Sequence, residues 1–300
     1  MTPWLSIVIP ARNDAAALAR TLAYLARLPG IAGAEVIVAA AGDVEGTTAA
    51  VAGRARLLWP HGSTRAQLMN AGAAAARRDT LLFLHADSFP PPEALSLIHG
   101  VLADPRAVGG AFEHLFAEPV WSLRAITWIN RIRYRLTRNY YGDQGVFVRT
   151  DVFRTLGGYR DLALMEDLDF TQRLKRCGRS VLITTPLVTS GRRFLARGPW
   201  RTFAFIVWLL ALWSLRLDTQ RYAERWRGPA TRTPGARRGK DARGDEELRT
   251  AKTEEPRDEA ENKKVRNDVA APEINGSGNL LDQPPHAPTR VSGTRYKCSS

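Results

Sequence analysis

Short β-branched runs alternate with longer segments rich in alanine and leucine over roughly the first 84 residues. The first run, residues 5–9, stops at Pro10, and the segment after it repeats leucine at helical spacing. Strands that are apolar throughout and alternate with helices are typical of a mostly parallel sheet flanked by helices. The pattern therefore predicts an α/β fold, with strands at residues 5–9, 35–38, 56–59 and 81–84 and helices at residues 14–28, 47–54 and 66–77.

Beyond Asp87 the alternation is less regular. We expect strands at residues 108–116, 145–148 and 181–184, and helices at residues 91–102, 121–138, 164–177 and 199–227. Residues 228–300 have almost no large apolar side chains and are dense in charge, proline and glycine, so they cannot bury enough apolar surface to offset chain entropy. The sequence predicts one domain over residues 1–227, ending in amphipathic helices at about 199–227, and a disordered tail over 228–300.

The net charge of +13 comes mostly from arginines in residues 124–138 and 173–201. A basic domain suits nucleic acid, anionic lipid or phosphorylated substrates, and charge alone does not choose among them. The two cysteines, Cys177 and Cys298, have no metal-ligand spacing. The N-terminus has no signal-peptide pattern and no apolar run reaches membrane-spanning length, so we expect a cytoplasmic protein.

Polar residues follow each of the first four predicted strands, at residues 10–14, 40–45, 61–65 and 85–87. Ligands of open α/β sheets bind outside the carboxyl ends of the strands. One polar strand end is what any turn provides. Four in succession favour a crevice for an anionic ligand.

Asp87 follows a fully apolar strand, where a carboxylate is placed to bind Mg²⁺ or Mn²⁺ bridging a diphosphate. The alternative is a helix N-cap. His85 is either a further metal ligand or a strand-end histidine satisfied by the backbone. The sequence leaves both pairs of alternatives open.

Three carboxylates, Glu166, Asp167 and Asp169, fall within four positions at the start of a predicted helix. The helix dipole and an i,i+4 pair of Asp169 with Arg173 account for one or two of them. The third favours a general base that takes a proton from an attacking hydroxyl. Asp143 and Gln144, between two glycines, are by themselves typical of a tight turn.

Four segments carry a resemblance to a known family: SIVIPARNDAAALARTLAYL, EVIV, RAQLMNAGAAAARRDTLLFLHADS and YGDQGVFVRTDVFRTLGGYRDLALMEDLDFTQRLKRCGR. In order and spacing they resemble the family 2 glycosyltransferases of the Rossmann-like GT-A fold, over about residues 4–190. The HADS and GGYRDLALMEDLDF pieces are similar to a bacterial subgroup named arsenosugar-biosynthesis or diaponeurosporenoate-type (carotenoid) glycosyltransferases.

The resemblance implies roles for particular residues. Asp87 matches the metal-binding carboxylate of the DxD motif, with His85 at its first position. Asp167 matches the catalytic base and Glu166 its acidic neighbour. The residues implied to bind the donor nucleotide-sugar are Pro10, Arg12, Asp14, Asp43, Arg65, Asn70, Ala86, Asp143 and Gln144. Ala40 stands where the family has an aspartate that contacts the base or ribose, and Asp43 or Glu45 are the candidates to compensate.

The implied reaction is metal-dependent, inverting transfer of a sugar, hexosyltransferase-like, to a hydroxyl or carboxyl acceptor, either a lipid- or carotenoid-like molecule or a small metabolite. Tryptophans and arginines in residues 121–138 and 200–213 favour peripheral contact with the inner face of the cell membrane. Packing on the domain core or a dimer contact explains them almost as well.

Two other classes of protein share some of these features. A sugar-phosphate nucleotidyltransferase would carry a glycine-rich loop where residues 11–14 read Ala-Arg-Asn-Asp. A non-catalytic basic protein that binds membrane or nucleic acid explains the charge, but gives no reason for the acids at Asp87 and Asp167. No aromatic RNA-binding signature is present, so no nucleic-acid partner is expected.

Overall fold

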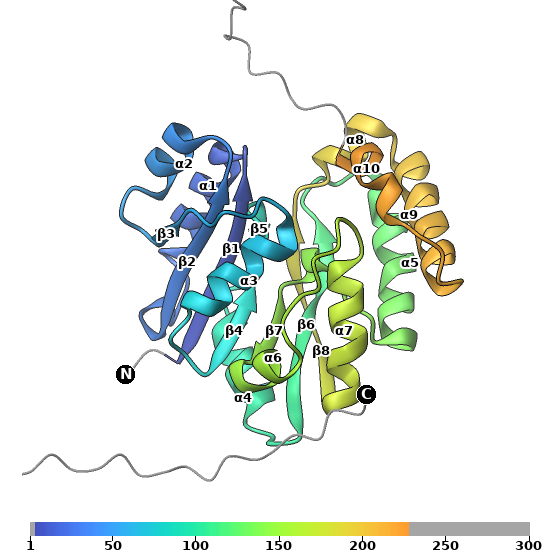
Figure 1. Cartoon of the computed structure of the whole chain (residues 1–300). Coiled ribbons are helices and arrows are strands. Elements are labelled where there is room, and N and C mark those ends of the chain that lie inside the picture. The colour runs from blue at the N-terminus through green and yellow to red at the C-terminus, as the bar shows by residue number, and fades with distance from the viewer. Residues whose placement is uncertain (1–3, 228–300) are drawn as a thin grey trace, which may run out of the picture. The chain divides into compact units, whose positions relative to one another are not determined.

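The computed structural model describes residues 4–227, and every structural statement below concerns that part of the chain. Its centre is an eight-stranded sheet with helices packed on both faces (Figure 1). In spatial order the strands are β3 (Arg56–Leu58), β2 (Ala34–Ala41), β1 (Leu5–Arg12), β4 (Thr80–Phe83), β7 (Val146–Arg149), β6 (Ala107–Phe116), β8 (Arg179–Thr189) and β5 (Ser88–Phe89). The predicted tail, residues 228–300, lies outside the described residues.

The first four strands in the chain pair in parallel, in the order β3-β2-β1-β4, which confirms the α/β prediction for this half. The other half is mixed, because β7 runs antiparallel to both β4 and β6, whereas β6 runs parallel to β8. The helices are α1 (Ala15–Leu25), α2 (Val44–Val51), α3 (Arg65–Ala75), α4 (Ala94–Leu102), α5 (Trp121–Thr137), α6 (Thr150–Thr155), α7 (Glu166–Cys177), α8 (Arg192–Arg197), α9 (Pro199–Ser214) and α10 (Ala223–Arg227), with 3₁₀ turns at Ile31–Gly33, Gly142–Gln144 and Gln220–Tyr222.

The two faces of the sheet have separate hydrophobic cores. In β1, Ile7 and Ile9 pack with Leu22 of α1 in one cluster. The intervening Val8 packs with Met69 of α3 in the other. Successive side chains of a strand point to opposite faces, so a strand covered on both sides is apolar at every position.

Helix α3 lies unusually close to β1. A Cβ on Gly72 would lie 2.4 Å from Cγ1 of Val8, so only glycine permits this approach. The N-cap of the helix is Thr64, whose side chain forms a capping box with Gln67. Close packing and a capped start together fix Arg65, the first residue of α3, near the carboxyl ends of the strands.

Strand β1 continues past Pro10 to Arg12, although the sequence predicts that it stops at the proline. Pairing between β1 and β4 ends at Val8 and Phe83, while pairing with β2 continues to Arg12. Pro10 therefore lies where β1 has a strand partner on one side only, and its missing N–H leaves no ladder position unpaired.

The helical stretch predicted over residues 199–227 is interrupted in the structure. Helix α9 ends at Ser214, and a 3₁₀ turn and α10 follow. Arg216 is left-handed, with φ +58°, and its N–H bonds to the carbonyl of Trp213, while Leu217 N–H bonds to the carbonyl of Leu212. These are the two hydrogen bonds of a Schellman C-cap, which ends a helix even where apolar periodicity continues.

The prediction from the sequence lacks β5, α6 and α8, and its range for β8 is too short. Of these, α8 matters most, because it follows β8 directly and faces the same end of the sheet as the polar strand ends (Figure 1). It packs against α9, and α9 packs against α5. Six residues are too few for helical periodicity to show in a sequence.

Candidate active site

A cavity of about 220 Å³ lies at the carboxyl ends of β4, β6 and β8, between the starts of α3 and α7 and the C-terminal helices. Asp87 and Asp167, predicted as metal ligand and base, both line it. They therefore share one cavity, although 80 residues of sequence separate them. Its polar lining consists of Arg65, His85, Asp87, Asn130, Tyr141, Asp143, Asp167, Thr189, Ser190, Arg192 and Arg193.

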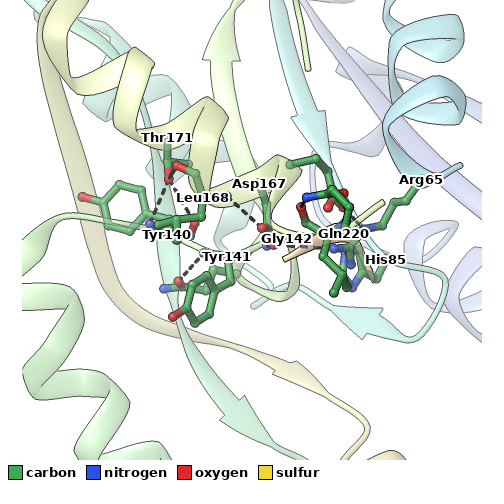
Figure 2. A network of polar contacts seen from close by, with 12 residues as sticks. Arg65, His85, Tyr140, Tyr141, Gly142, Asp167, Leu168, Thr171 and Gln220 are labelled. Atoms are coloured by element: carbon green, nitrogen blue, oxygen red, sulfur yellow. Dashed lines mark hydrogen bonds and ion pairs between the residues drawn. The ribbon is translucent and has the colours of Figure 1, made fainter. Parts of the chain in front are cut away.

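Asp167 is held at both carboxylate oxygens. The backbone N–H of Gly142 donates to Oδ2 over 2.6 Å, and the N–H of Leu168 donates to Oδ1 over 2.7 Å (Figure 2). Met165, left-handed with φ +66°, turns the chain into α7, so that Asp167 lies in the first helical turn near the positive end of the helix dipole. The side chain is 11% exposed, and that exposed part faces the cavity.

Arg65 links three of the predicted residues. Its guanidinium forms an ion pair with Glu166, lies 3.7 Å from Oδ2 of Asp167 and 3.1 Å from Nε2 of His85 (Figure 2). Glu166 is buried behind Asp167, and desolvation raises its pKa although Arg65 opposes that rise. The pair fixes the guanidinium against the start of α7.

His85 is uncharged in this setting. Desolvation first, then the positive charges of Arg65 and Arg193, hold its pKa well below the usual range. A neutral imidazole beside a guanidinium accepts a hydrogen bond, which assigns the Nε2 lone pair to Arg65 and the proton to Nδ1. His85 therefore has no free Nε2 lone pair for a metal ion in this arrangement.

Asp87 faces an arginine of α8. Its Oδ2 lies 3.7 Å from a guanidinium nitrogen of Arg192, and the same guanidinium pairs with Asp14. Burial raises the pKa of Asp87, with a smaller contribution from Asp14, and Arg192 opposes the rise. Two carboxylates thus lie close enough to share one positive charge.

The described residues contain no group of three or more His, Cys, Asp or Glu side chains arranged for a metal ion. Mg²⁺ and Mn²⁺ in nucleotide sites, however, use one or two carboxylates and complete their shell with phosphate oxygens and water. Asp87 and Asp14, whose carboxylates lie beside the same guanidinium nitrogen of Arg192, fit that requirement. The site therefore suits a divalent cation that arrives with a diphosphate.

Arg193 is a cavity cation that forms no ion pair with the described residues. Its guanidinium lies 5.3 Å from the ring centroid of Trp226. Desolvation and the nearby Arg65 and Arg197 lower its pKa, although arginine stays protonated at any physiological pH. With Arg65 and Arg192 it gives the cavity three guanidinium groups for an anionic ligand, and the formal charge of these groups is balanced by Asp87, Asp143 and Asp167.

The residues predicted to bind the donor nucleotide-sugar separate into two groups. Arg65 and Asp143 line the cavity, and Asp14 reaches it through its pair with Arg192. Asp143 contacts the buried His114 over 3.7 Å, and its Oδ1 has no hydrogen-bond partner among the described residues. The predicted donor residues that do not line the cavity are Pro10, Arg12, Asp43, Asn70, Ala86 and Gln144.

Three of these have clear structural contacts instead. Asn70 exchanges two hydrogen bonds with the backbone of Tyr159, 2.8 and 2.9 Å long. Gln144 is fully buried, accepts from Tyr141 N–H and donates to the carbonyl of Phe112. Asp43 caps α2 by accepting from the N–H of Gly46, and its own N–H donates to Asn13.

The other three have less specific surroundings. The carbonyl of Ala86 accepts from the Thr21 hydroxyl, and a guanidinium nitrogen of Arg12 lies 3.5 Å from the carbonyl of Ser63. Pro10 is a half-buried residue of β1. Ala40 is fully buried in β2 and offers no polar group.

Sequence reasoning missed Arg192, Arg193 and Tyr141, all of which line the cavity. The signal for the first two was present in the basic excess of residues 173–201, and only two residues separate the pair from the end of β8. Tyr141 precedes the Gly142 turn, and the Arg133 guanidinium lies over its ring, 3.9 Å from the centroid. Nothing in the local sequence distinguishes it from a core tyrosine.

No helix of residues 4–227 combines the length and the apolar character needed to cross a bilayer. The predicted tryptophan-rich helices are present as α5 and α9, and both leave large apolar side chains exposed. Trp121 is 71% exposed and Trp128 is 63% exposed. Contact of these helices with a membrane stays a prediction.

Solved structures resemble this chain at low identity. A mannosyltransferase from Pyrobaculum calidifontis, in complex with GDP-Man and Mn²⁺, has a TM-score of 0.51 and 20% identity, over 63% of this chain and 57% of that one. TarS of S. aureus, residues 1–349, has a TM-score of 0.50 and 14% identity, over 63% of this chain and 60% of that one. The same protein in complex with UDP gives 0.50 and 15%, over 64% and 62%.

This chain thus spans less than two thirds of the length of each of these structures. A search of curated proteins finds no significant match. The family described as Glycosyl transferase family 2 matches residues 6–156, about half of the chain, from the second residue of β1 to just past α6. On that match, and with a GT-A architecture in the structure, the chain belongs to glycosyl transferase family 2.

Proposed function

We propose that this protein is an inverting glycosyltransferase that moves a sugar from a nucleotide-sugar donor to a hydroxyl or carboxyl acceptor. One observation carries the proposal: Asp87 and Asp167 line a single cavity together with three arginines. The solved structures add support, since the mannosyltransferase holds GDP-Man with Mn²⁺ and TarS holds UDP. Assignment to the arsenosugar or diaponeurosporenoate subgroup stays a prediction from the HADS and GGYRDLALMEDLDF segments.

Asp167 is proposed as the general base. Both oxygens accept backbone N–H bonds, which orient the carboxylate, and each oxygen keeps a further lone pair for a substrate proton. In the proposed reaction an acceptor hydroxyl attacks the anomeric carbon, its proton passes to Asp167, and the bond from that carbon to the diphosphate oxygen breaks. A single displacement of this kind inverts the anomeric centre, with base catalysis contributing about 10²- to 10⁴-fold.

The three cavity arginines are proposed to bind the departing diphosphate. Arg193, which has no ion-pair partner among the described residues, can form new charge-assisted hydrogen bonds without breaking old ones. Arg65 and Arg192 are already oriented by carboxylates. Preorganised positive charge is worth most where it meets the charge that develops on the leaving group.

Asp87, aided by Asp14, is the residue proposed to hold Mg²⁺ or Mn²⁺. When bound, such an ion would neutralise charge on the diphosphate as a Lewis acid. Arg192 now satisfies both carboxylates, so its guanidinium must share them with the ion or move toward the phosphates. His85, neutral and bonded to Arg65, is proposed to orient that arginine.

The proposed function is tested by a donor screen on the full chain. Release of nucleoside diphosphate from UDP-, GDP- and TDP-sugars is measured with Mn²⁺ and with a chelator. We expect one donor to be consumed faster with Mn²⁺, and the matching nucleoside diphosphate plus Mn²⁺ to raise the melting temperature. The protein is a nucleotidyltransferase instead if no donor is consumed and no nucleoside diphosphate raises the melting temperature, while a nucleoside triphosphate and a sugar phosphate yield pyrophosphate.

A peripheral position on the inner face of the cell membrane is proposed from α5 and α9. Trp121 and Trp128 are exposed on α5 beside the exposed Arg124, and Trp208 is exposed on α9. Tryptophan and arginine together suit the interface of an anionic bilayer.

Sedimentation with phosphatidylserine vesicles tests this position. The Trp121→Ser/Trp128→Ser variant should lose binding. Trp59→Ser, at a tryptophan immediately after β3 that is 41% exposed, is the control and should retain binding. Equal sedimentation of both variants, or none by the unaltered protein, contradicts the proposal.

A further inference from the structure

The cavity has an apolar wall that the proposed donor chemistry does not use. Its members come from β6, α8, α9 and α10, and they are Phe116, Phe194, Phe203, Ile206, Leu209 and Trp226. The phosphates and hydroxyls of a nucleotide-sugar suit the arginines and carboxylates of the cavity rather than this wall. The wall therefore needs a second ligand group to cover it.

The wall is a packed part of the fold. The rings of Phe116 and Phe194 meet edge to face with centroids 4.9 Å apart, and Phe203 packs against the same small core. Leu209 belongs to a separate cluster, against which Trp226 packs. The wall is thus held in place before any ligand binds, which lowers the entropic cost of binding.

Helix α9 carries most of this wall and is itself little covered. Of its sixteen residues only Thr202 and Leu209 are buried, and its one charged residue is Arg201. Phe203 and Ile206 are half-buried and line the cavity, whereas their neighbour Val207 is 47% exposed on the outside. One apolar helix therefore separates the cavity from an apolar outer surface.

The wall does not suit the donor's base. The strand order places β6 and β8 on one side of β4 and β7, and β1, β2 and β3 on the other. Arg12 and Asp43, which the family resemblance implies for the nucleotide, stand at the end of β1 and just after β2, away from α9. A base bound there would leave the apolar wall uncovered.

The wall begins beside the proposed base. Leu164 and Met165, immediately before α7, also line the cavity, and Asp167 follows two residues later. A molecule with its apolar part on the wall would therefore present a polar end to Asp167. Burying apolar surface in a preformed pocket is favourable by about 0.8 kcal/mol per methylene, or close to a fourfold gain in affinity.

We propose that the acceptor is an amphiphile, whose hydroxyl or carboxyl head lies at Asp167 and whose apolar tail packs against Phe116, Phe194, Phe203, Ile206, Leu209 and Trp226. This inference rests on the proposed function, because Asp167 is taken as the base. It favours a lipid-like acceptor over a small polar metabolite. Helix α9 carries most of the wall on one face and exposed apolar side chains on its outer face, as delivery of the acceptor from a lipid surface requires.

The test uses the full chain and n-alkyl β-glucosides with tails of four to twelve carbons, below their critical micelle concentrations. Binding is measured by titration calorimetry, and transfer is measured with the donor found in the screen. We expect Kd and acceptor KM to fall by about fourfold per methylene until the wall is covered. The same affinity for short and long tails overturns the proposal, whatever the variants do.

Two variants one residue apart provide the matched comparison. Ile206→Ser, on the cavity wall, should raise the Kd and KM for the long-tailed glucoside by about tenfold. Val207→Ser, on the exposed face of the same helix, should change neither. Circular dichroism and melting temperature establish that both are folded; a rise in donor KM instead of acceptor KM for Ile206→Ser would assign the wall to the donor and overturn the proposal.

Failure of the acceptor inference and failure of the proposed function give different results. Donor hydrolysis to water, and protection by nucleoside diphosphate with Mn²⁺, report on the function without any acceptor. If both occur and tail length has no effect, only the inference fails. If tails bind in the expected series but no donor is consumed or protects, the cavity is an amphiphile site and the transferase proposal fails.

Discussion

The backbone N–H of Gly142 donates a 2.6 Å hydrogen bond to Oδ2 of Asp167, joining a 3₁₀ turn before β7 to the first turn of α7. A Cβ at position 142 would lie 2.6 Å from Nε2 of His85 and 3.4 Å from the same Asp167 oxygen. The glycine is therefore required by close approach to two site residues. It positions the proposed base and does not itself line the cavity.

Gly142→Ala should lower kcat by about tenfold to a hundredfold, because a shift near 1 Å at the base is costly. Donor KM should change little, since the arginines that bind the diphosphate keep their own partners. Steady-state kinetics check this against Gly100→Ala in α4, where a Cβ meets nothing within 4 Å. Equal kcat for both variants would show that the contact does not matter.

Asp167→Asn should abolish most turnover, a loss of about 10²- to 10⁴-fold, because an amide cannot accept the proton. One of the two backbone donors would then face the amide NH₂, which should also cost about 1–3 kcal/mol of stability. Nucleoside diphosphate release and urea unfolding are measured together. Asp151→Asn on α6 is the control, and near-normal transfer by folded Asp167→Asn would falsify the assignment of the base.

Arg193→Met should weaken donor binding by about tenfold to a hundredfold, the effect of one charge-assisted hydrogen bond. It should also make binding less dependent on salt, because a cavity charge is removed. Arg201→Met, an exposed arginine on α9 that does not line the cavity, should leave donor Kd unchanged. Identical Kd values for the two variants would exclude Arg193 from the diphosphate site.

Asn70→Ala should destabilise the fold by about 1–3 kcal/mol, because it leaves buried backbone groups of Tyr159 without partners. Nucleoside diphosphate affinity should stay within twofold of normal. Urea unfolding and calorimetry separate the two effects. A large loss of nucleoside diphosphate affinity with unchanged stability would show that Asn70 binds the nucleotide-sugar, as the family resemblance implies.

Acid should destabilise the protein through His85. Its pKa is depressed in the folded state, so the unfolded chain binds the proton first, and the free energy of unfolding falls as pH drops below about 6.5. The contribution is present above pH 6.5 and has a slope of at most about 1.4 kcal/mol per pH unit. His114 is shifted in the same direction and for the same first cause, burial.

His85→Asn should therefore lose less stability than the unaltered protein between pH 7.5 and 5. Urea unfolding at both pH values gives the comparison, with His61→Asn, in the loop before α3, as the control. An unchanged pH dependence in His85→Asn would mean that the imidazole is charged or solvated in the folded protein.

Local periodicity was enough to predict much of the fold. The apolar runs at residues 5–9 and 81–84 became neighbouring parallel strands, because a strand covered on both faces is apolar at every position. The carboxylates at Asp87 and Asp167 could be named as candidates because each stands at a strand or helix end, which short sequence windows reveal. The break at Arg216 was not visible, because a left-handed non-glycine residue has no clear sequence signal.

The site itself depended on contacts between distant residues. Asp14 pairs with Arg192, 178 positions away, and only the docking of α8 beside β8 brings them together. Periodicity could not show that Asn70 binds backbone or that Gln144 is buried, because each depends on which segment packs beside it. The sequence alone determined the alternation of elements and the positions of its acids, since these are local properties. Tertiary packing decided which charges face the cavity and which apolar side chains close it, since those are distances between segments far apart in the chain.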